Sequence, residues 1–422
     1  MKFKNDGNAG TGKSSNVLIF NCGSSSVKYQ IIGFPSEEVL VRGEAEKVGA
    51  SGREKSYVKH QTRDNKPVLL TVEMKDYPSA FGEIMKFLEK DFAADSGLFP
   101  DAIGHRYVHT GDHFNRTTLI TPGVLKILEK TVELAPVHNP VSLNIIRQCL
   151  KRMPDLPEYL VVDTAFHSTI PRACRTYPLP SALMKKYGIR KYGFHGTSHK
   201  YVMQEACRFL GVKPQDQKII SCHLGSGGSS ICAISNGRSV DNTMGFTPLQ
   251  GLVMNTRSGD IDPALPFYIM RSENITMKEV GSLLNKKSGL LGLTGSTRDL
   301  RDILGRIKTD RNSDTAFRMY ASRVKEYIGA YYMLLKKFDV LIFTDSLGTQ
   351  VPALRSLICS EMDALGIRID ERANADPSQG PMDVSDRMST VRIIVLPTNE
   401  ELMIGRECYA QKANGDPARR AS

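Results

Sequence analysis

Histidine, arginine and carboxylate side chains gather in six short clusters of this 422-residue chain, each beside glycine or at the end of an apolar run. Such side chains transfer protons, neutralise anions and bind hard cations, so together they indicate a site for small charged substrates. A single histidine beside glycine is more often a turn or capping residue, and the inference therefore depends on the whole set. The clusters cover residues 104–109, 137–140, 163–167, 193–199, 255–263 and 397–401.

Two hairpins are predicted about 200 residues apart. The apolar runs 17–20 and 27–32 flank a turn of asparagine, cysteine, glycine and serine, and the runs 219–223 and 231–234 flank a similar Gly/Ser turn. Short Gly/Ser turns expose backbone N–H groups and hydroxyls to an oxyanion. The repeat indicates two related domains, each with its own turn for phosphate.

The remaining pattern alternates strands and helices. Residues 159–163 and 340–345 each predict a buried strand that ends in aspartate, and the apolar spacing over 314–336 predicts a core helix. Residues 52–77 are strongly polar and predict an exposed hairpin or loop. The alternation favours an α/β fold, arranged as two lobes around a cleft.

Composition excludes several classes of protein. With 41% hydrophobic and 24% charged residues the chain is neither disordered, collagenous nor a coiled coil, and no apolar run approaches the ~20 residues of a membrane span. The net charge of +11 is dispersed and there is no tryptophan, which argues against nucleic acid and favours phosphate-bearing ligands. Eight scattered cysteines and a polar N-terminus predict reduced thiols and a cytoplasmic enzyme.

One motif is interpreted as a chance match. Residues 7–14 fit the P-loop pattern, but that loop works only after a buried strand and before a helix. Here polar residues precede the motif and an apolar strand follows it, so we expect it to lie in a flexible tail.

The clusters carry motifs that resemble those of the acetate kinase family, within the sugar kinase, Hsp70 and actin superfold. The motifs include N-x-G-S-S-S-x-K, G-H-R-x-V-H, D-T-A-F-H, Y-G-F-H-G-T-S-H, T-R-S-G-D-I-D-P and T-N-E-E-L, and the resemblance runs over residues 16–408. It implies two duplicated βββαβαβα domains, 16–165 with 400–412 and 166–399, between flexible tails at 1–15 and 413–422. It also implies a homodimer that reversibly transfers a phosphoryl group to acetate, giving acetyl phosphate.

The resemblance assigns roles at the reacting centre. Arg106 would hold the acceptor carboxylate, Arg257 would brace the transferring phosphoryl group, and His195 would donate to its equatorial oxygens. Asp163 would be the essential carboxylate, in a positioning role, because a carboxylate nucleophile needs no strong base. Two lobes are expected to close over the substrates and exclude water.

Further residues follow from the same resemblance. Mg²⁺, with Mn²⁺ as an alternative, would be fixed by Asn21 and Glu400. The acceptor site would be formed by Val108, Val137, Asn139, Phe194 and Pro248. The phosphate or nucleotide set would be Ser24, Ser26, Lys28, His223, Leu224, Gly225, Ser226, Gly227, Asp299, Leu300, Arg301, Asp345, Ser346, Leu347 and Gly348.

The donor loops depart from the ATP-using members of the family. Ser226 replaces asparagine in H-L-G-N-G, and residues 343–350 read F-T-D-S-L-G-T-Q where those members read F-T-A-G-I-G-E-N. Side chains fill space where glycine lets backbone lie against a purine. These changes resemble the amoebal branch, which uses pyrophosphate and phosphate, so we predict that donor pair. The alternatives are an ordinary ATP/ADP enzyme and a broad donor preference.

Two further alternatives lie outside this prediction. A non-catalytic sensor of acyl phosphate or nucleotide would be expected to lack some of Arg106, Asp163, Arg257 and Glu400, and all are present. A butyrate-type kinase would need a larger acceptor pocket.

Overall fold

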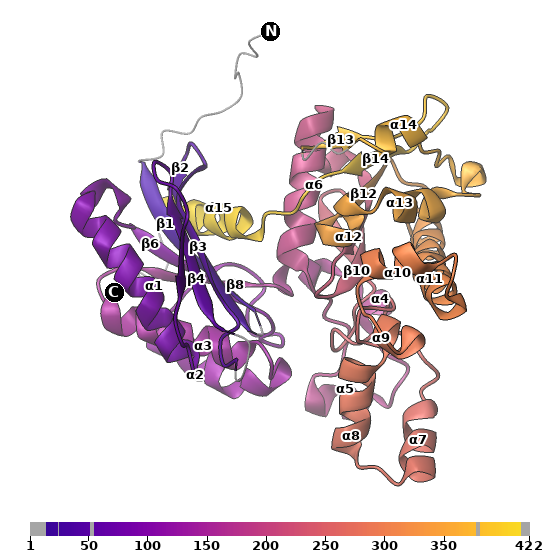
Figure 1. Ribbon diagram of the computed structural model, residues 1–422, viewed down its shortest axis with the longest axis horizontal. Helices are drawn as coiled ribbons and strands as arrows, with labels where there is room; N and C mark the ends of the chain where they lie inside the picture. The colour runs from indigo at the N-terminus through magenta and orange to yellow at the C-terminus, as the bar shows by residue number, and fades with distance from the viewer. Residues whose placement is uncertain (1–13, 24, 51–54, 377–379, 415–422) are drawn as a thin grey trace. The chain divides into compact units, whose positions relative to one another are not determined.

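The computed structural model describes residues 14–23, 25–50, 55–376 and 380–414, and the chain divides into two compact units (Figure 1). Unit 1 contains the residues up to 165 and from 400 onward, and unit 2 contains residues 166–399. The domains implied by the family resemblance were divided at the same residues, 165/166 and 399/400. Ser24 and residues 7–13 of the P-loop match lie outside the described residues.

Unit 1 has, in its described part, an eight-stranded sheet of order β5-β4-β3-β2-β1-β6-β8-β7. β1 to β5 form an antiparallel meander, while β6 pairs in parallel with both β1 and β8. The strands are β1 (Ser15–Cys22), β2 (Ser26–Phe34), β3 (Glu38–Glu46), β4 (Tyr57–Thr62), β5 (Val68–Thr71), β6 (Ala102–Tyr107), β7 (Thr118–Leu119) and β8 (Glu158–Val162).

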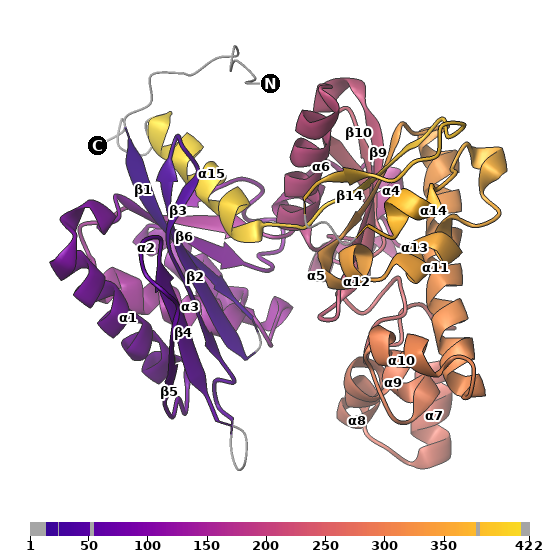
Figure 2. The ribbon, with the colours of Figure 1, turned by 45° about the horizontal axis from the view of Figure 1, so that its top comes forward.

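Helices cover both faces of this sheet, because both sets of alternating side chains on β1 are apolar. Leu18 and Phe20 belong to the core that contains residues of α1 and α3, whereas Val17 and Ile19 share a core with residues of α15. α15 comes from the other end of the chain and packs on β1 and β6 (Figure 2). The helices of unit 1 are α1 (Tyr77–Ala94), α2 (Pro122–Lys130), α3 (Asn139–Arg152) and α15 (Glu400–Ala413).

Unit 2 repeats the central plan of unit 1. Its described residues form a six-stranded sheet of order β11-β10-β9-β12-β14-β13, in which β9 to β11 are antiparallel and β12 is parallel to β9 and β14. The two predicted hairpins, β1–β2 and β9–β10, occupy matching places in the two sheets. The strands are β9 (Lys218–Leu224), β10 (Ser229–Ser235), β11 (Arg238–Asn242), β12 (Val340–Thr344), β13 (Met382–Asp383) and β14 (Arg392–Val395).

The predicted core helix is α11, whose apolar stripe packs against the sheet of unit 2. It begins after Asp310, which caps it by accepting from the N–H groups of Asn312 and Ser313, and it buries Phe317, Tyr320 and Val324 among others. The helices of unit 2 are α4 (Arg172–Arg175), α5 (Ser181–Tyr187), α6 (Gly196–Leu210), α7 (Leu265–Glu273), α8 (Met277–Ser282), α9 (Gly289–Thr294), α10 (Leu300–Arg306), α11 (Arg311–Leu335), α12 (Asp345–Gln350), α13 (Pro352–Cys359) and α14 (Glu371–Asn374).

The predicted tails are shorter at their inner ends than expected. β1 already begins at Ser15, which pairs with Phe34 and is buried, and α15 continues to Ala413. The Nζ of Lys412 donates to the Oγ of Ser15 at 2.9 Å, so the last turn of α15 contacts the first residue of β1. That bond ties Ser15, which was predicted to lie in the N-terminal tail, to the last turn of α15.

Candidate functional site

Three predicted residues of unit 1 meet at the carboxyl ends of adjacent parallel strands. Asn21 lies on β1, Arg106 on β6, and Asp163 directly follows β8. The Nη2 of Arg106 donates to the Oδ2 of Asp163 at 3.0 Å, and its Nη1 donates to the Oδ1 of Asn21 at 3.1 Å. Carboxyl ends of parallel strands in α/β sheets are where such folds place ligands.

The first turn of α15 brings two more carboxylates to this place. The Nδ2 of Asn21 donates to the Oε2 of Glu400 at 3.1 Å and to the Oε1 of Glu401 at 2.9 Å. Glu401 was missed by the sequence analysis, although it is the second glutamate of the T-N-E-E-L motif. Residues from both ends of the chain therefore build one polar cluster.

Electrostatics fix the charge of Arg106. Burial alone would lower the pKa of its guanidinium, but the carboxylates of Asp163 and Glu400 raise it above the ordinary value. Its Nε, which is buried, has no hydrogen-bond partner among the described residues, and the Oε2 of Glu400 lies 3.9 Å away. Arg106 is thus a permanent cation held in a fixed orientation.

Other predicted residues of unit 1 differ in their surroundings. Lys28 pairs with Asn21 across the β1–β2 hairpin, so both side chains are on the same face of the sheet. Ser26 accepts through its backbone carbonyl from the N–H of Gly23 at 2.9 Å, which closes the turn. Val108 is buried, whereas Val137 is 52% exposed.

Asn139 is fully buried and contacts backbone. Its Nδ2 donates to the carbonyls of His109 and Thr131 at 2.7 and 3.0 Å, and its Oδ1 accepts from the N–H of His109. These bonds tie the start of α3 to the segment after β6. Contact between Asn139 and substrate stays a prediction. The structure shows that the Asn139 amide holds the segment that follows β6.

In unit 2 the predicted histidines form a connected group. His195 precedes α6 with a left-handed backbone (φ 57°), and its ring centroid lies 4.2 Å from that of His223 on β9. The Nδ1 of His195 is 2.9 Å from the Oγ of Ser230, which also lies 2.9 Å from the Nε2 of His199. Burial, together with the three neighbouring histidines, holds the pKa of His199 well below its usual value, so this ring is neutral.

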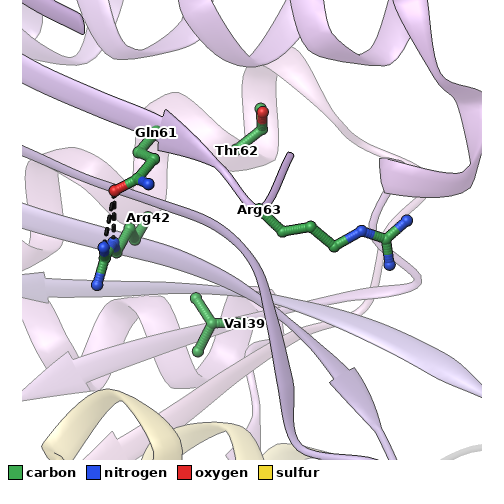
Figure 3. A pocket seen from close by; sticks show the side chains of 5 residues that line it. All are labelled: Val39, Arg42, Gln61, Thr62 and Arg63. Carbon is green, nitrogen blue, oxygen red and sulfur yellow. Dashed lines mark hydrogen bonds between the residues drawn. The ribbon is translucent and has the colours of Figure 1, made fainter. Parts of the chain in front are cut away.

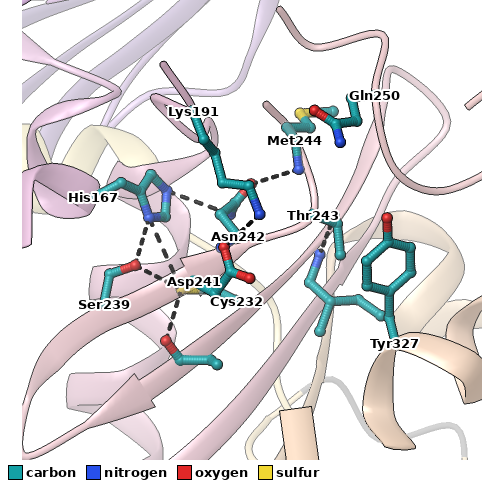
Figure 4. Close-up of polar contacts among 12 residues, drawn as sticks. His167, Lys191, Cys232, Ser239, Asp241, Asn242, Thr243, Met244, Gln250 and Tyr327 are labelled. Atoms are coloured by element: carbon teal, nitrogen blue, oxygen red, sulfur yellow. Dashed lines mark hydrogen bonds and ion pairs between the residues drawn. The ribbon is translucent and has the colours of Figure 1, made fainter. Parts of the chain in front are cut away.

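Polar side chains around His167 support the turn that carries His195, and Figure 4 shows the contacts of His167 with Ser239 and Asn242. The Nε2 of His167 lies 2.9 Å from the carbonyl oxygen of Phe194, and the Nδ2 of Asn242 donates to the same oxygen at 3.3 Å. The Nδ1 of His167 lies 2.8 Å from the Oγ of Ser239. His167, which belongs to the D-T-A-F-H cluster, is therefore committed to backbone support.

Arg257 lies in a loop between β11 and α7. Its guanidinium contacts the carbonyl of Pro248 at 3.5 Å and the sulfur of Met254 at 3.7 Å, and no carboxylate among the described residues lies within ion-pair distance. Burial lowers the pKa of Arg257. The Oδ1 of Asp260, at the end of the loop, accepts from the N–H of Gly251 at 3.0 Å.

The β9–β10 turn contacts α12 through residues that depart from the ATP-using pattern. The N–H of Ser226 donates to the Oγ of Ser346 at 3.1 Å, and the Nε2 of His223 is 3.0 Å from the Oδ2 of Asp345. Burial would raise the pKa of Asp345, but His223, the N–H of Ser346 and His195 lower it to about 2. Asp345 and Ser346, which depart from the ATP-using pattern, therefore contact the β9–β10 hairpin directly.

Among the other residues predicted to bind phosphate or nucleotide, some lie at the surface and some lie in the core. Asp299 caps α10 and pairs with Arg301, whose Nη1 donates to the Oε1 of Gln350 at 2.9 Å, beside the end of α12. In contrast, the side chains of Leu224, Leu300 and Leu347 are fully buried and belong to the core of unit 2.

A pocket of about 230 Å³ lies elsewhere, on unit 1 between β3 and β4 (Figure 3). The Nε and Nη2 of Arg42 donate there to the Oε1 of Gln61 at 3.0 and 2.7 Å. None of the predicted site residues lines it; the lining residues are Val39, Arg42, Gln61, Thr62 and Arg63.

The two predicted metal ligands, Asn21 and Glu400, would bind a cation through oxygen atoms. Within the described ranges no group of three or more His, Cys, Asp or Glu side chains is arranged to hold a metal ion. Asn21 and Glu400 supply an amide oxygen and a carboxylate beside a cationic guanidinium. Oxygen atoms of these types are the ligands that Mg²⁺ would use in the predicted role, and here the Oδ1 of Asn21 accepts from Arg106 while the Oε2 of Glu400 accepts from Asn21.

The repeated sheets, each with a run of at least three antiparallel strands, two parallel strands and a Gly/Ser hairpin, place the chain in the sugar kinase, Hsp70 and actin fold class. The model of the acetokinase family matches residues 16–406. The chain is 45% identical to the acetate kinase of Dictyoglomus turgidum, over 93% of this chain and 96% of that protein. It belongs to the acetokinase family.

Solved structures agree with this assignment. The acetate kinase of Porphyromonas gingivalis matches with a TM-score of 0.85 and 38% identity, covering 94% of this chain and 99% of that one. A propionate kinase from Francisella tularensis matches with a TM-score of 0.86 and 37% identity, with the same coverage. No helix in the described part of the chain is both long and apolar enough to cross a membrane.

Proposed function

We propose that this protein is an acetate kinase, which reversibly transfers a phosphoryl group between acetyl phosphate and a phosphate acceptor. The observation that carries the proposal is the family match over residues 16–406, within which Arg106, Asp163, His195 and Arg257 are all present. In the direction of acetyl phosphate synthesis, a carboxylate oxygen of acetate attacks phosphorus. One P–O bond forms, the P–O bond to the leaving phosphate breaks, and no proton has to move.

Unit 1 supplies the acceptor side in this proposal. Acetate is an anion, and Arg106 is a cation whose orientation is fixed by Asp163 and Asn21. Asp163 therefore acts by aligning the guanidinium and not as a base. Val108 and Val137 would contact the methyl group, and a pocket that discriminates one methylene weakly, by roughly 1–3 kcal/mol, would also admit propionate.

Unit 2 supplies cations for the transferring group. Arg257 is partly buried and has no carboxylate neighbour within ion-pair distance among the described residues, so its charge is available to bind an added anion. His195 lies close to the same turn: a Cβ built on Gly228 would be 3.1 Å from the Nη1 of Arg257 and 3.4 Å from the Cε1 of His195. Two cationic or hydrogen-bonding groups at one turn suit the equatorial oxygens of a phosphoryl group.

We propose Mg²⁺ as the cofactor, with Mn²⁺ as the alternative. Asn21 and Glu400 would hold it, and when bound it would neutralise charge on the phosphate oxygens. Glu401 lies next to the same amide and would belong to the same set. Chelation should abolish turnover, and Glu400→Ala should raise the Mg²⁺ concentration needed for half-maximal rate.

For the phosphoryl donor we propose pyrophosphate, with phosphate as its product. Support comes from the joined residues of α12 and the β9–β10 turn, where Asp345 and Ser346 place side chains at positions that are small in the ATP-using pattern. Acetyl phosphate would then react with phosphate to give pyrophosphate and acetate. The alternative remains ATP and ADP, because the relatives are described as acetate kinases without a stated donor.

A direct donor comparison tests the proposal. Purified protein with Mg²⁺ and acetyl phosphate is given either phosphate or ADP, and phosphorus NMR follows the appearance of pyrophosphate or ATP. The expected result is rapid pyrophosphate formation with little ATP. Turnover with ADP alone would overturn the pyrophosphate assignment and leave the acetate kinase assignment standing, while inertness toward acetyl phosphate would contradict both.

We also propose a homodimer. Apolar side chains on the neighbouring helices α7 and α8 are unusually exposed, with Phe267 at 74%, Tyr268 at 59% and Met277 at 77%. Side chains of this size at such exposure indicate a covered surface. A second copy of the chain is the occupant that the family resemblance implies.

A further inference from the structure

Asp345 occupies an unusual place in the phosphate turn of unit 2. It begins α12 with a left-handed backbone (φ 61°), immediately after β12 ends. Its carboxylate fills the space that Gly225 leaves empty, because a Cβ built on Gly225 would lie only 1.9 Å from the Oδ2 of Asp345. A negative side chain therefore sits directly on a turn whose glycines and serines otherwise suit an anion.

Each oxygen of the Asp345 carboxylate has one partner and can still accept another hydrogen bond. Its Oδ2 is 3.0 Å from the Nε2 of His223, and its Oδ1 accepts from the N–H of Ser346 at 2.7 Å. Each oxygen of an ionised carboxylate can accept a second hydrogen bond. Because 32% of the Asp345 side chain is exposed, a ligand can reach those remaining lone pairs.

The two ends of the turn differ in charge. Gly228 faces the Nη1 of Arg257 and the ring of His195, whereas Gly225 faces the carboxylate of Asp345. The pKa of Asp345, held at about 2 by His223 and its other partners, keeps this group an acceptor at neutral pH. A phosphate bound to the turn would meet donors at one end and a pure acceptor at the other.

Only some phosphates satisfy such a site. Inorganic phosphate and pyrophosphate keep a P–OH group near neutral pH, which can donate to a carboxylate. The inner phosphates of ATP are bridged through oxygen on both sides and have only acceptor oxygens, and two acceptors placed together repel. For the same reason sulfate, which has the shape of phosphate but no proton at neutral pH, should bind this turn more weakly than phosphate.

We propose that Asp345 selects the donor by accepting a hydrogen bond from the P–OH group of inorganic phosphate or pyrophosphate held at the Gly225–Gly228 turn. This inference rests on the proposed pyrophosphate-linked function and names the residue that determines it. His223 and Ser346 hold the carboxylate in place for that contact.

The test compares phosphate with sulfate in the intact protein. With acetyl phosphate and Mg²⁺, the KM for phosphate and the inhibition constant of sulfate are measured for wild type, Asp345→Asn and Asp345→Ala. Wild type should bind phosphate about 10- to 100-fold better than sulfate, the range expected for one charge-assisted hydrogen bond. In both variants the phosphate KM should rise and sulfate should inhibit more strongly, so that the ratio approaches one.

Controls separate selectivity from damage. Asp363→Asn alters an exposed ion pair with Arg368 elsewhere in unit 2 and should keep the wild-type ratio. If Asp345 only supported His223, its variants would weaken both anions equally, and the unchanged ratio would overturn the inference. Wild-type protein that uses phosphate but binds sulfate equally well would also overturn it. Turnover with ADP alone would instead show that the proposed donor itself is wrong.

Discussion

Two arginines of the candidate site have opposite surroundings. Arg106 is joined to Asp163 and Asn21, so its charge is already balanced and its orientation set. Arg257 is partly buried, and its side-chain hydrogen-bond partners in the described residues are a carbonyl and a thioether. Arg106 therefore suits precise alignment of a substrate carboxylate. Arg257 suits binding of the negative charge on the phosphoryl group in the transition state.

Arg257→Ala should therefore act on turnover. We expect kcat to fall by roughly 10²–10³-fold, the usual cost of removing one preorganised group that stabilises the transition state. The KM for acetate should change little, since Arg106 is intact. Steady-state kinetics check this, with Arg152→Ala, an exposed arginine on α3, as the control, and near-normal kcat would contradict the assigned role.

The cysteines differ sharply in exposure, which gives a second prediction. All eight are free, and Cys174 alone among them is not buried. Burial raises the pKa of the other thiols, for example that of Cys22 to about 12, so both access and ionisation oppose their reaction. A thiol reagent should modify Cys174 first in the native protein and all eight after denaturation, as mass spectrometry would show. Rapid native labelling of Cys222 would contradict the buried core.

At the scale of elements, the short helix α12 is held by one fully buried arginine. Arg355 on α13 donates from its Nη1 to the carbonyls of Gly348 and Thr349 at 2.9 and 2.8 Å. Its Nε and Nη2 donate to the side chain and carbonyl of Asn374. The guanidinium thus satisfies the last carbonyls of the helix that carries Asp345, although burial lowers its pKa to about 10.

Arg355→Met should destabilise unit 2. It leaves several buried carbonyls without donors, at roughly 1–3 kcal/mol for each unsatisfied group, so the melting temperature should drop by several degrees. Thermal unfolding measures this, and Arg318→Met, which removes an exposed pair with Asp314 on α11, should cause a much smaller change. Equal melting temperatures for the two variants would refute this account of α12.

Local sequence patterns predicted the helices and strands better than they predicted the contacts between residues far apart in the chain. The runs beside the two Gly/Ser turns and the stripe on α11 are contiguous in sequence, so periodicity revealed them. By contrast, the bond between Ser226 and Ser346 joins residues 120 positions apart, and no local pattern encodes it. Asn139 shows the same limit, because only tertiary structure reveals that its amide is committed to backbone.

At the scale of the whole molecule, the exposed apolar side chains of α7 and α8 predict the assembly. Phe267→Glu places a charge on that surface, so the proposed dimer should dissociate to a mass near 46.8 kDa in light scattering after size-exclusion chromatography. Met388→Glu, at a residue 71% exposed outside these helices, is the matched control. A wild-type monomer would refute the dimer.

The path of α15 has a consequence for how the protein is made. This helix covers the sheet of unit 1 beside Phe34 and Gly104, and Ile404 and Cys408 complete a core that begins at Val17. The ribosome produces those residues only after the whole of unit 2. Until then the nascent unit 1 has an uncovered apolar face, and exposed apolar surface of this kind favours aggregation during synthesis.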